Sequence, residues 1–259
     1  MTILERIIAD KLRDVSDLRS RTTFESFLQR AKDLPVPRRF REAIARPNRI
    51  SLIAERKKAS PSTGLIRERF DPVEIAEAYE TAGVSAISVL TEANHFLGDP
   101  SYLSITRNHS KRPLLRKDFI VDPIQIPESR ILGADAILLI VAALEKKVLA
   151  DFLKLARELS LDALVEVHDE GELQTALEAG ADAIGINNRN LNTFEVNLQT
   201  TFDLIPKIPD GIVTVSESGI FSSLDVGLLR DVGVDAVLVG EAFMRADNVV
   251  AAVRRLMGR

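Results

Sequence analysis

Lysine, carboxylate and amide side chains stand at the ends of six short apolar runs. Ammonium and carboxylate groups held close together donate and accept protons, which is the work of general acid–base catalysis. The sequence therefore offers a candidate site for proton transfer, provided that the fold brings these run ends together. In chain order the side chains are Glu55 with Lys57, Glu92, Lys117, Glu166, Asn187 with Arg189, and Glu217.

The spacing predicts that these side chains share one face of each strand. Side chains alternate between the two faces, so a residue two positions beyond a core residue continues the inward parity. Leu115 is followed in this way by Lys117, and Leu164 by Glu166. A single charged strand end is explained equally well by an ion pair at the rim. Six such strand ends together favour a site in which Lys and Glu side chains have shifted, coupled pKa values.

An internal repeat identifies the elements that must carry these residues. Four copies of one pattern, a glycine followed by a short turn and an apolar run, begin at Gly83, Gly133, Gly180 and Gly233. The glycine predicts the end of a helix and the run predicts a buried parallel strand. The copies are about 50 residues apart, which corresponds to two strand–helix units of a parallel barrel.

Further apolar runs, at residues 50–54, 113–115, 163–165 and 212–215, lie between the copies and supply alternate strands. Helical patterns follow the strands, with Asp71-Pro72 and Asp122-Pro123 predicting N-caps. Residues 145–159, 170–179 and about 246–257 are further predicted helices. Eight alternating units predict an α/β fold of the (β/α)8 TIM barrel type rather than an open doubly wound sheet. No G-x-G-x-x-G motif opens the first unit, which weighs against dinucleotide binding.

Residues 1–48 predict an N-terminal helical extension of a single barrel domain that spans residues 1–259. Two helices are expected, the second near residues 24–31, followed by a linker that contains Pro35, Pro37 and Pro47. The apolar stripe predicts packing on the barrel surface rather than an interaction module, with the edge of the active site as a further location. The stripe of the first helix consists of Ile3, Ile7, Ile8, Leu12 and Val15.

Barrel topology also predicts a phosphate site. The loops after the seventh and eighth strands of such barrels commonly bind phosphoryl groups through backbone N–H groups. Here those loops carry Ser218-Gly219 and Gly240-Glu241, and Arg189 after the sixth strand can add a bidentate contact. The Glu241 carboxylate must then point away from the phosphate.

Composition restricts the classes of function. The 259 residues carry a formal net charge of −4 with 46% hydrophobic residues, enough for a sizeable core. The chain has no cysteine, and His95, His109 and His168 stand in dissimilar contexts, so neither a thiol nucleophile nor a metal site is expected. We expect His168 to be a loop residue, or a residue that supports the site from behind, rather than a base, since nothing near it in the sequence pairs with it as a relay.

The surroundings of the protein follow from the same features. Without a basic tract, and with 5% aromatic residues, no nucleic-acid partner is expected. The apolar runs are too short to span a membrane, and Glu5, Arg6 and Asp10 interrupt the first helix, so no signal peptide is expected. We predict a cytoplasmic protein, a monomer or weak homodimer, that acts on a small molecule.

The ordered set of charged motifs resembles the indole-3-glycerol phosphate synthase family. The resemblance extends through all eight units and includes the helical extension. It implies conversion of 1-(2-carboxyphenylamino)-1-deoxyribulose 5-phosphate to indole-3-glycerol phosphate with release of carbon dioxide and water, without a metal or organic cofactor. The matching segments are residues 53–62 (IAERKKASPS), 90–92 (LTE), 115–119 (LRKDF), 164–168 (LVEVH), 185–189 (GINNR) and 217–220 (ESGI).

The resemblance also implies roles for individual residues. Lys117 would be the general acid and Glu166 the general base, while Lys57 would contact the substrate and act in the dehydration. Glu55, Asn187 and Glu217 would hold the lysines and orient the intermediate. The substrate-binding residues would be Pro61, Phe96 and Phe119 around the anthranilate ring, Arg189, Ser218, Gly219, Gly240 and Glu241 at the phosphate, and Ser60.

Two alternatives remain at this point. Phosphoribosylanthranilate isomerase is another phosphosugar barrel, but its reaction calls for a Cys or Asp acid–base pair, whereas this chain has no cysteine and places lysines at the strand ends. The second alternative is a barrel that binds phosphate without catalysis. Loss of turnover with retained fold in Lys117→Ala distinguishes catalysis from both a structural and a purely binding role.

Overall fold

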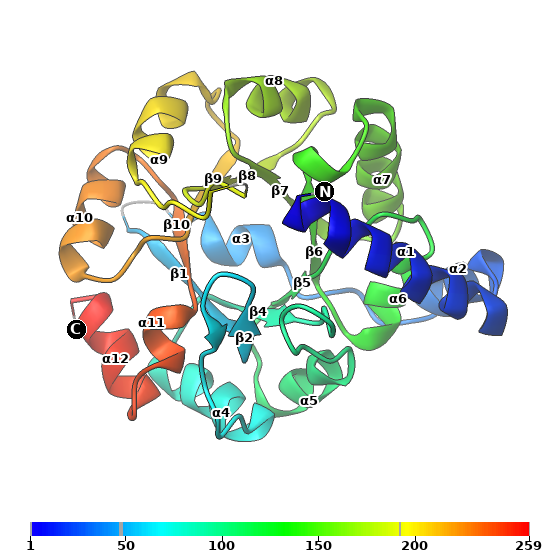
Figure 1. The fold of residues 1–259 in the computed structure, drawn as a ribbon, viewed down its shortest axis with the longest axis horizontal. Coiled ribbons are helices and arrows are strands. Elements are labelled where there is room, and N and C mark those ends of the chain that lie inside the picture. Colours follow the sequence, from blue (N-terminus) through cyan, green and yellow to red (C-terminus); the bar gives the residue numbers. More distant parts are fainter. Residues whose placement is uncertain (1, 47–48, 192, 259) are drawn as a thin grey trace.

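Eight parallel strands close into a barrel that is surrounded by helices (Figure 1). This architecture, seen in a computed structural model that describes residues 2–46, 49–191 and 193–258, confirms the predicted (β/α)8 barrel. Around the ring, β1 pairs with both β4 and β10, so no strand edge is left open. The barrel strands are β1 Ser51–Arg56, β4 Ala86–Leu90, β5 Leu114–Lys117, β6 Ala136–Ile140, β7 Asp162–Val167, β8 Ala183–Asn187, β9 Val213–Glu217 and β10 Ala236–Val239.

The strand register brings the predicted site residues to one edge. Glu166 on β7 lies opposite Gly185 on β8, and Asn187 on β8 lies opposite Glu217 on β9. After β1, residues 59–65 form a hairpin of two short strands, β2 Ala59–Ser60 and β3 Gly64–Leu65. The sequence analysis did not anticipate this hairpin.

Helices follow the strands as the alternation predicts, with two differences at their starts. Asp71 caps α4 by accepting the N–H groups of Val73 and Glu74, as predicted. The predicted cap at Asp122 is wrong, because α6 begins at Gln125 and Asp122 instead accepts the N–H of Ile124 in the preceding turn. The last predicted helix, about residues 246–257, is present as α12 Val249–Leu256, and a short helix that was not predicted, α11 Glu241–Met244, precedes it.

The remaining helical elements of the barrel are α4 Pro72–Ala82, α5 Ser101–His109, α6 Gln125–Leu132, η1 Val141–Ala143, α7 Lys146–Glu158, α8 Glu170–Glu178, α9 Gln199–Leu204, η2 Ile205–Lys207 and α10 Ser223–Asp231. Most of them bury one apolar face against the outer side of the barrel. Leu149 and Leu153 of α7, for example, pack with Val165 of β7 in one buried cluster.

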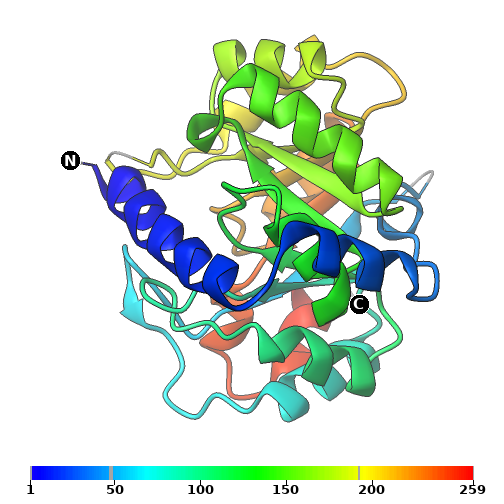
Figure 2. The ribbon, with the colours of Figure 1, turned by 90° about the vertical axis from the view of Figure 1, so that its right-hand side faces the viewer.

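The chain before β1 passes from one end of the barrel to the other. Helix α1 (Ile3–Arg21) lies beside the barrel, with α2 (Phe24–Lys32) next to α6 (Figures 1 and 2). A third helix, α3 (Phe40–Ile44), which the sequence analysis placed in a linker, inserts Phe40 and Ile44 into the barrel interior. Pro47 and the predicted domain boundary at residue 48 lie outside the described residues.

The buried face of α1 differs from the predicted stripe. Leu12 is 51% exposed, whereas Lys11 is only 6% exposed and forms an ion pair with Asp118. Ile7 and Val15 are buried as predicted. Within the described residues, no helix combines the length and apolar character needed to cross a membrane.

Candidate active site

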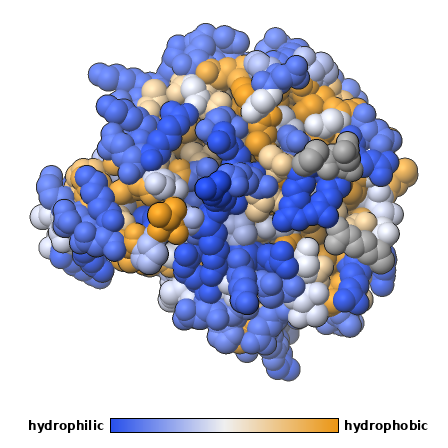
Figure 3. Space-filling model, turned by 180° about the vertical axis from the view of Figure 1, so that it is seen from behind, coloured by the Kyte–Doolittle hydropathy of each residue, from blue (hydrophilic) through white to orange (hydrophobic). Residues whose placement is uncertain are grey.

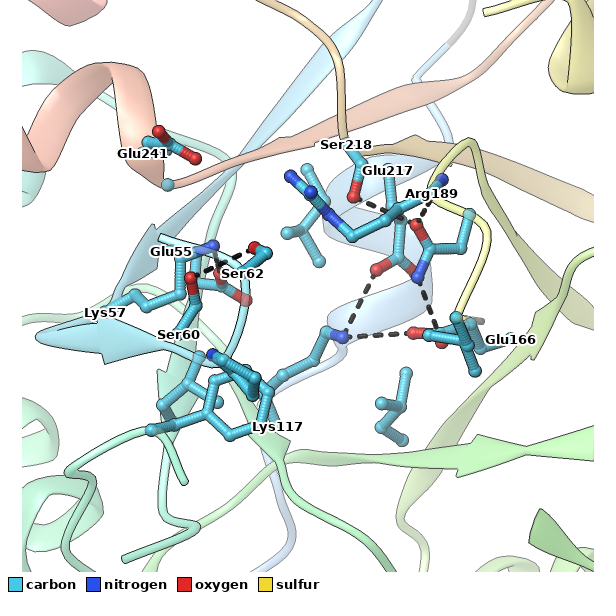
Figure 4. A pocket seen from close by; sticks show the side chains of 18 of the residues that line it. Glu55, Lys57, Ser60, Ser62, Lys117, Glu166, Arg189, Glu217, Ser218 and Glu241 are labelled. Atoms are coloured by element: carbon cyan, nitrogen blue, oxygen red, sulfur yellow. Dashed lines mark hydrogen bonds and ion pairs between the residues drawn. The ribbon is translucent and has the colours of Figure 1, made fainter. Parts of the chain in front are cut away.

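A cavity of about 150 Å³ opens at the carboxyl ends of the strands. Every residue predicted to act in catalysis or substrate binding borders it, with Glu92 of the charged strand ends as the exception, so the fold gathers positions that are up to 186 residues apart into one place. These residues are Glu55, Lys57, Ser60, Pro61, Phe96, Lys117, Phe119, Glu166, Asn187, Arg189, Glu217, Ser218, Gly219, Gly240 and Glu241. Figure 4 shows the polar members facing one another from different strands.

Lys117 lies at the centre of the charged cluster. Its Nζ donates to Glu166 Oε2 at 3.0 Å and lies 3.4 Å from Glu217 Oε2. Burial alone would lower the pKa of Lys117, but the charges of Glu166 and Glu217 raise it well above its ordinary value. Burial would conversely raise the pKa of Glu166, but Lys117 holds it well below the usual range. The site therefore pairs a charged acid with an ionised base.

Glu217 differs from Glu166 in protonation. Burial raises the pKa of Glu217 to about 7, with the nearby carboxylates Glu166 and Glu55 acting in the same direction and Lys117 against them. Its Oε1 has no hydrogen-bond partner among the described residues. Two carboxylates on the same lysine thus have different pKa values, as proton transfer at neutral pH requires.

Asn187 links Glu166 to the loop after β9. Its Nδ2 donates to Glu166 Oε1 at 3.2 Å, and its Oδ1 accepts the hydroxyl of Ser218 at 2.9 Å and the N–H of Arg189 at 3.1 Å. One amide therefore fixes the Glu166 carboxylate relative to two of the predicted phosphate ligands.

A second pair, Glu55 and Lys57, lies at the end of β1. Lys57 Nζ is 3.3 Å from Glu55 Oε1, and Ser88 donates its hydroxyl to Glu55 Oε2 at 3.2 Å. Glu55 is 4% exposed. The cavity therefore holds two separate lysine–carboxylate units.

The loop after β9 has the tight backbone that a phosphate site requires. Ser218 and Gly219 both adopt left-handed backbone, at φ +67° and +78°. A Cβ on Gly219 would lie 2.5 Å from Val196 Cγ1, so only glycine fits there. Asn188, which the sequence analysis did not select, donates from its Nδ2 to the carbonyl groups of Glu217 and Ser218 and so holds this turn. The sequence feature that could have identified Asn188 is that it is a second amide side chain, directly after Asn187, at the end of β8.

Glu241 turns away from the centre of the site. Its carboxylate accepts two N–H groups of Arg245, at 2.9 and 3.0 Å, one helical turn later. Figure 4 shows the side chain apart from the Lys117 cluster. The orientation matches the expectation that only the backbone of Glu241 faces the phosphate.

The opposite side of the cavity is apolar. The rings of Phe96 and Phe119 are 6.2 Å apart between centroids and tilted by 39°. Ile3, Leu4 and Ile7 of α1 complete this wall, so the extension does border the site. The apolar stripe of α1 was visible in the sequence, but nothing in it indicated that this end reaches the barrel mouth.

Glu92 was predicted to join the charged cluster, but the structure places it outside. Its carboxylate accepts the N–H groups of Asn94, His95 and Phe96, at 2.7 to 3.0 Å, within its own loop. Because this loop begins directly after β4 ends, the strand parity no longer applies to residue 92. Glu92 positions Phe96 instead.

The statement that nothing pairs with His168 is also wrong. His168 Nδ1 lies 2.9 Å from Glu172 Oε2 and its Nε2 lies 3.4 Å from Glu166 Oε1. It does not border the cavity, which agrees with its expected place outside the site. Among the described residues, no group of three or more His, Asp or Glu side chains has the arrangement of a metal site.

Solved structures support the fold alone. A 3-hexulose-6-phosphate synthase from Salmonella typhimurium superposes with a TM-score of 0.65 at 16% identity, covering 81% of this chain and 97% of that chain. KGPDC from Streptococcus mutans superposes at 0.62 and 14% identity, covering 82% and 97%.

Sequence comparison is more specific. The family model of indole-3-glycerol phosphate synthase matches residues 4–256. Indole-3-glycerol phosphate synthase of Alkaliphilus metalliredigens is 48% identical, covering 98% of this chain and 97% of its own length. That of Acetivibrio thermocellus is 50% identical, covering 97% and 98%. Since the match is nearly complete in both directions, the chain belongs to the indole-3-glycerol phosphate synthase family, carboxy-lyases of tryptophan biosynthesis.

Proposed function

We propose that Lys117 and Glu166 are the acid and base that close the indole ring of 1-(2-carboxyphenylamino)-1-deoxyribulose 5-phosphate in this cavity. The observation that carries the proposal is the contact of 3.0 Å between Lys117 Nζ and Glu166 Oε2 in a largely enclosed site. It supports a proton donor and acceptor that face the same substrate atoms.

In the ring closure, the aryl carbon that bears the carboxylate attacks the ketone carbon of the sugar chain. Lys117 protonates the carbonyl oxygen as the new carbon–carbon bond forms, because negative charge develops there. Loss of carbon dioxide returns the bonding electrons to the ring. The hydroxyl group then leaves as water, with Lys57 as the proposed acid and Glu166 removing the proton that restores the aromatic system.

The order of the strands supports a substrate orientation in which the phosphate and the anthranilate ring lie on opposite sides of the barrel mouth. The proposed phosphate ligands, Arg189, Ser218, Gly219 and the backbone at Gly240 and Glu241, follow β8, β9 and β10. Phe96 and Phe119, proposed to contact the anthranilate ring with Pro61, follow β4 and β5. Because β5 and β9 lie across the ring from each other, a substrate held at both ends spans the centre, where Lys117 lies.

Glu55, Asn187 and Glu217 are proposed to position the lysines and the intermediate. Each contacts a lysine or the Glu166 carboxylate: Glu55 at 3.3 Å from Lys57, Asn187 at 3.2 Å from Glu166, and Glu217 at 3.4 Å from Lys117. They hold the reacting groups in place before substrate binds.

The test is turnover of the carboxyphenylamino substrate, followed by the fluorescence of indole-3-glycerol phosphate. Lys117→Ala is expected to lose about 10²-fold or more of kcat. Lys154→Ala, at an exposed position of α7, is the matched control and should retain full activity. Wild-type-like kcat in Lys117→Ala would refute the role of the acid.

The family match over residues 4–256 excludes the isomerase alternative. Binding of a reduced substrate analogue without turnover by the wild type would indicate a barrel that binds phosphate without catalysis.

Assembly and location are likewise proposed from general features, as a cytoplasmic monomer or weak homodimer. The face turned away from the viewer in Figure 1 is mostly hydrophilic, with hydrophobic side chains in separate places (Figure 3). Among the large exposed apolar residues, Val36 and Leu65 lie on separate segments, whereas Phe221, Leu224, Leu228 and Val232 lie on or beside α10. Sedimentation equilibrium tests the proposal, which a tight oligomer at micromolar concentration would refute.

A further inference from the structure

His168 bridges two carboxylates behind the cavity. It follows β7 directly, and its side chain is 13% exposed. Nδ1 lies 2.9 Å from Oε2 of Glu172 on α8, which also accepts the backbone N–H of His168 at 2.8 Å. On the other side, Nε2 lies 3.4 Å from Glu166 Oε1. The ring therefore connects the proposed base to a carboxylate that is 21% exposed.

The charges of the site favour a cation beside Glu166. Glu166 is a buried carboxylate that shares its partner Lys117 with Glu217. A buried charge is costly unless it is paired. The imidazolium of His168 adds a second positive charge beside Glu166, and it does so without occupying the cavity.

The surroundings keep His168 protonated. Burial alone would lower its pKa, but the Glu166 carboxylate at 3.4 Å and the hydrogen bond to Glu172 raise the pKa to about 10. No charged side chain comes from η1 (Val141–Ala143), which packs on β7 and α8. On α8, Asp169 caps the helix through the N–H of Glu172, and Glu170 pairs with Lys207.

The two carboxylate oxygens of Glu166 have different partners, and Oε1 has two of them. Oε2 accepts from Lys117, while Oε1 accepts from Asn187 and faces His168. We propose that His168 is a positioning residue that holds Glu166 through Oε1 and keeps it ionised beside Lys117. This inference rests on the proposed role of Glu166 as the base.

The test compares His168→Gln with Glu166→Gln and a control. Loss of the imidazolium is expected to move the acid limb of the kcat/KM profile to higher pH by about one unit, since an adjacent cation lowers a carboxylate pKa by one or more units. We expect kcat to fall while KM changes little. Glu172→Gln should give a smaller shift in the same direction. His109→Gln, whose imidazole pairs with Glu77 on the surface, should match the wild type.

A second measurement does not depend on the folding of His168→Gln. In the His95→Gln/His109→Gln variant, the single remaining imidazole can be titrated by ¹⁵N NMR, and it should stay protonated at pH 8. A neutral ring at pH 7, or a His168→Gln profile that superposes on the wild type, would overturn the inference. If Glu166→Gln retains wild-type turnover, the proposed function fails instead, so the two failures are distinguishable.

Discussion

Replacing Glu217 by Gln is expected to stabilise the folded protein at alkaline pH. Glu217 is 2% exposed, and its Oε1 has no partner among the described residues. Burial raises its pKa from 4.5 to about 7, even though Lys117 lies 3.4 Å away. The ionised carboxylate is therefore less stable in the folded chain than in the unfolded chain. Gln keeps the shape of the neutral acid and removes the ionisation.

The pH window follows from the sign of this shift. A carboxyl group whose pKa is raised in the folded state lowers the free energy of unfolding by the full amount at pH values above that pKa. This loss disappears as the pH falls from about 7 to 4.5. One pKa unit corresponds to about 1.4 kcal/mol, so the complete shift corresponds to roughly 3 kcal/mol. Glu217→Gln should gain about that much free energy of unfolding at pH 8.5, and the two proteins should converge near pH 4.

Urea unfolding measures this difference at both pH values. Because the chain contains no Trp, far-UV circular dichroism is the suitable signal. Glu68→Gln, at an exposed loop position, controls for the loss of one negative charge and should show no comparable gain. A Glu217→Gln protein that is less stable than the wild type at pH 8.5 would mean that the ion pair with Lys117 outweighs the effect of burial, which would refute the reasoning.

Three further substitutions test the packing around the site. Gly185→Ala should lower kcat and cost about 1–3 kcal/mol of stability, since its Cβ would lie 2.3 Å from Glu217 Oε1; unchanged kinetics and an unchanged urea midpoint would contradict this. Lys11→Met should lower the free energy of unfolding by about 1–3 kcal/mol, because Asp118 loses a buried partner at 2.9 Å; the loss should disappear in the Asp118→Asn background, and persistence there would count against the ion pair. Asp71→Ala should cost about 1 kcal/mol through loss of the α4 cap, with Asp71→Asn retaining most of the stability in the same urea experiment.

The order of elements and the inward parity of the charged residues were determined by the sequence itself. The repeat that begins at Gly83 and recurs through Gly233 predicts alternating strands and helices, and a parallel barrel is the closed arrangement of eight such units. Strand alternation then placed Lys117 and Glu166 on the inner face, and both lie there. These properties are periodic and local, so a single chain reveals them.

Contacts between distant elements were decided only by the tertiary structure. Side chains alternate between two faces only within a strand, and Glu92 lies beyond the end of β4. Its carboxylate therefore accepts the N–H groups of its own loop rather than facing the cavity. Lys11 looks like a surface residue in the sequence, yet it is buried because Asp118 lies under α1. His168 acquires its role because α8 returns Glu172 to the end of β7. Each outcome depends on which side chains meet after packing, and no local period encodes that.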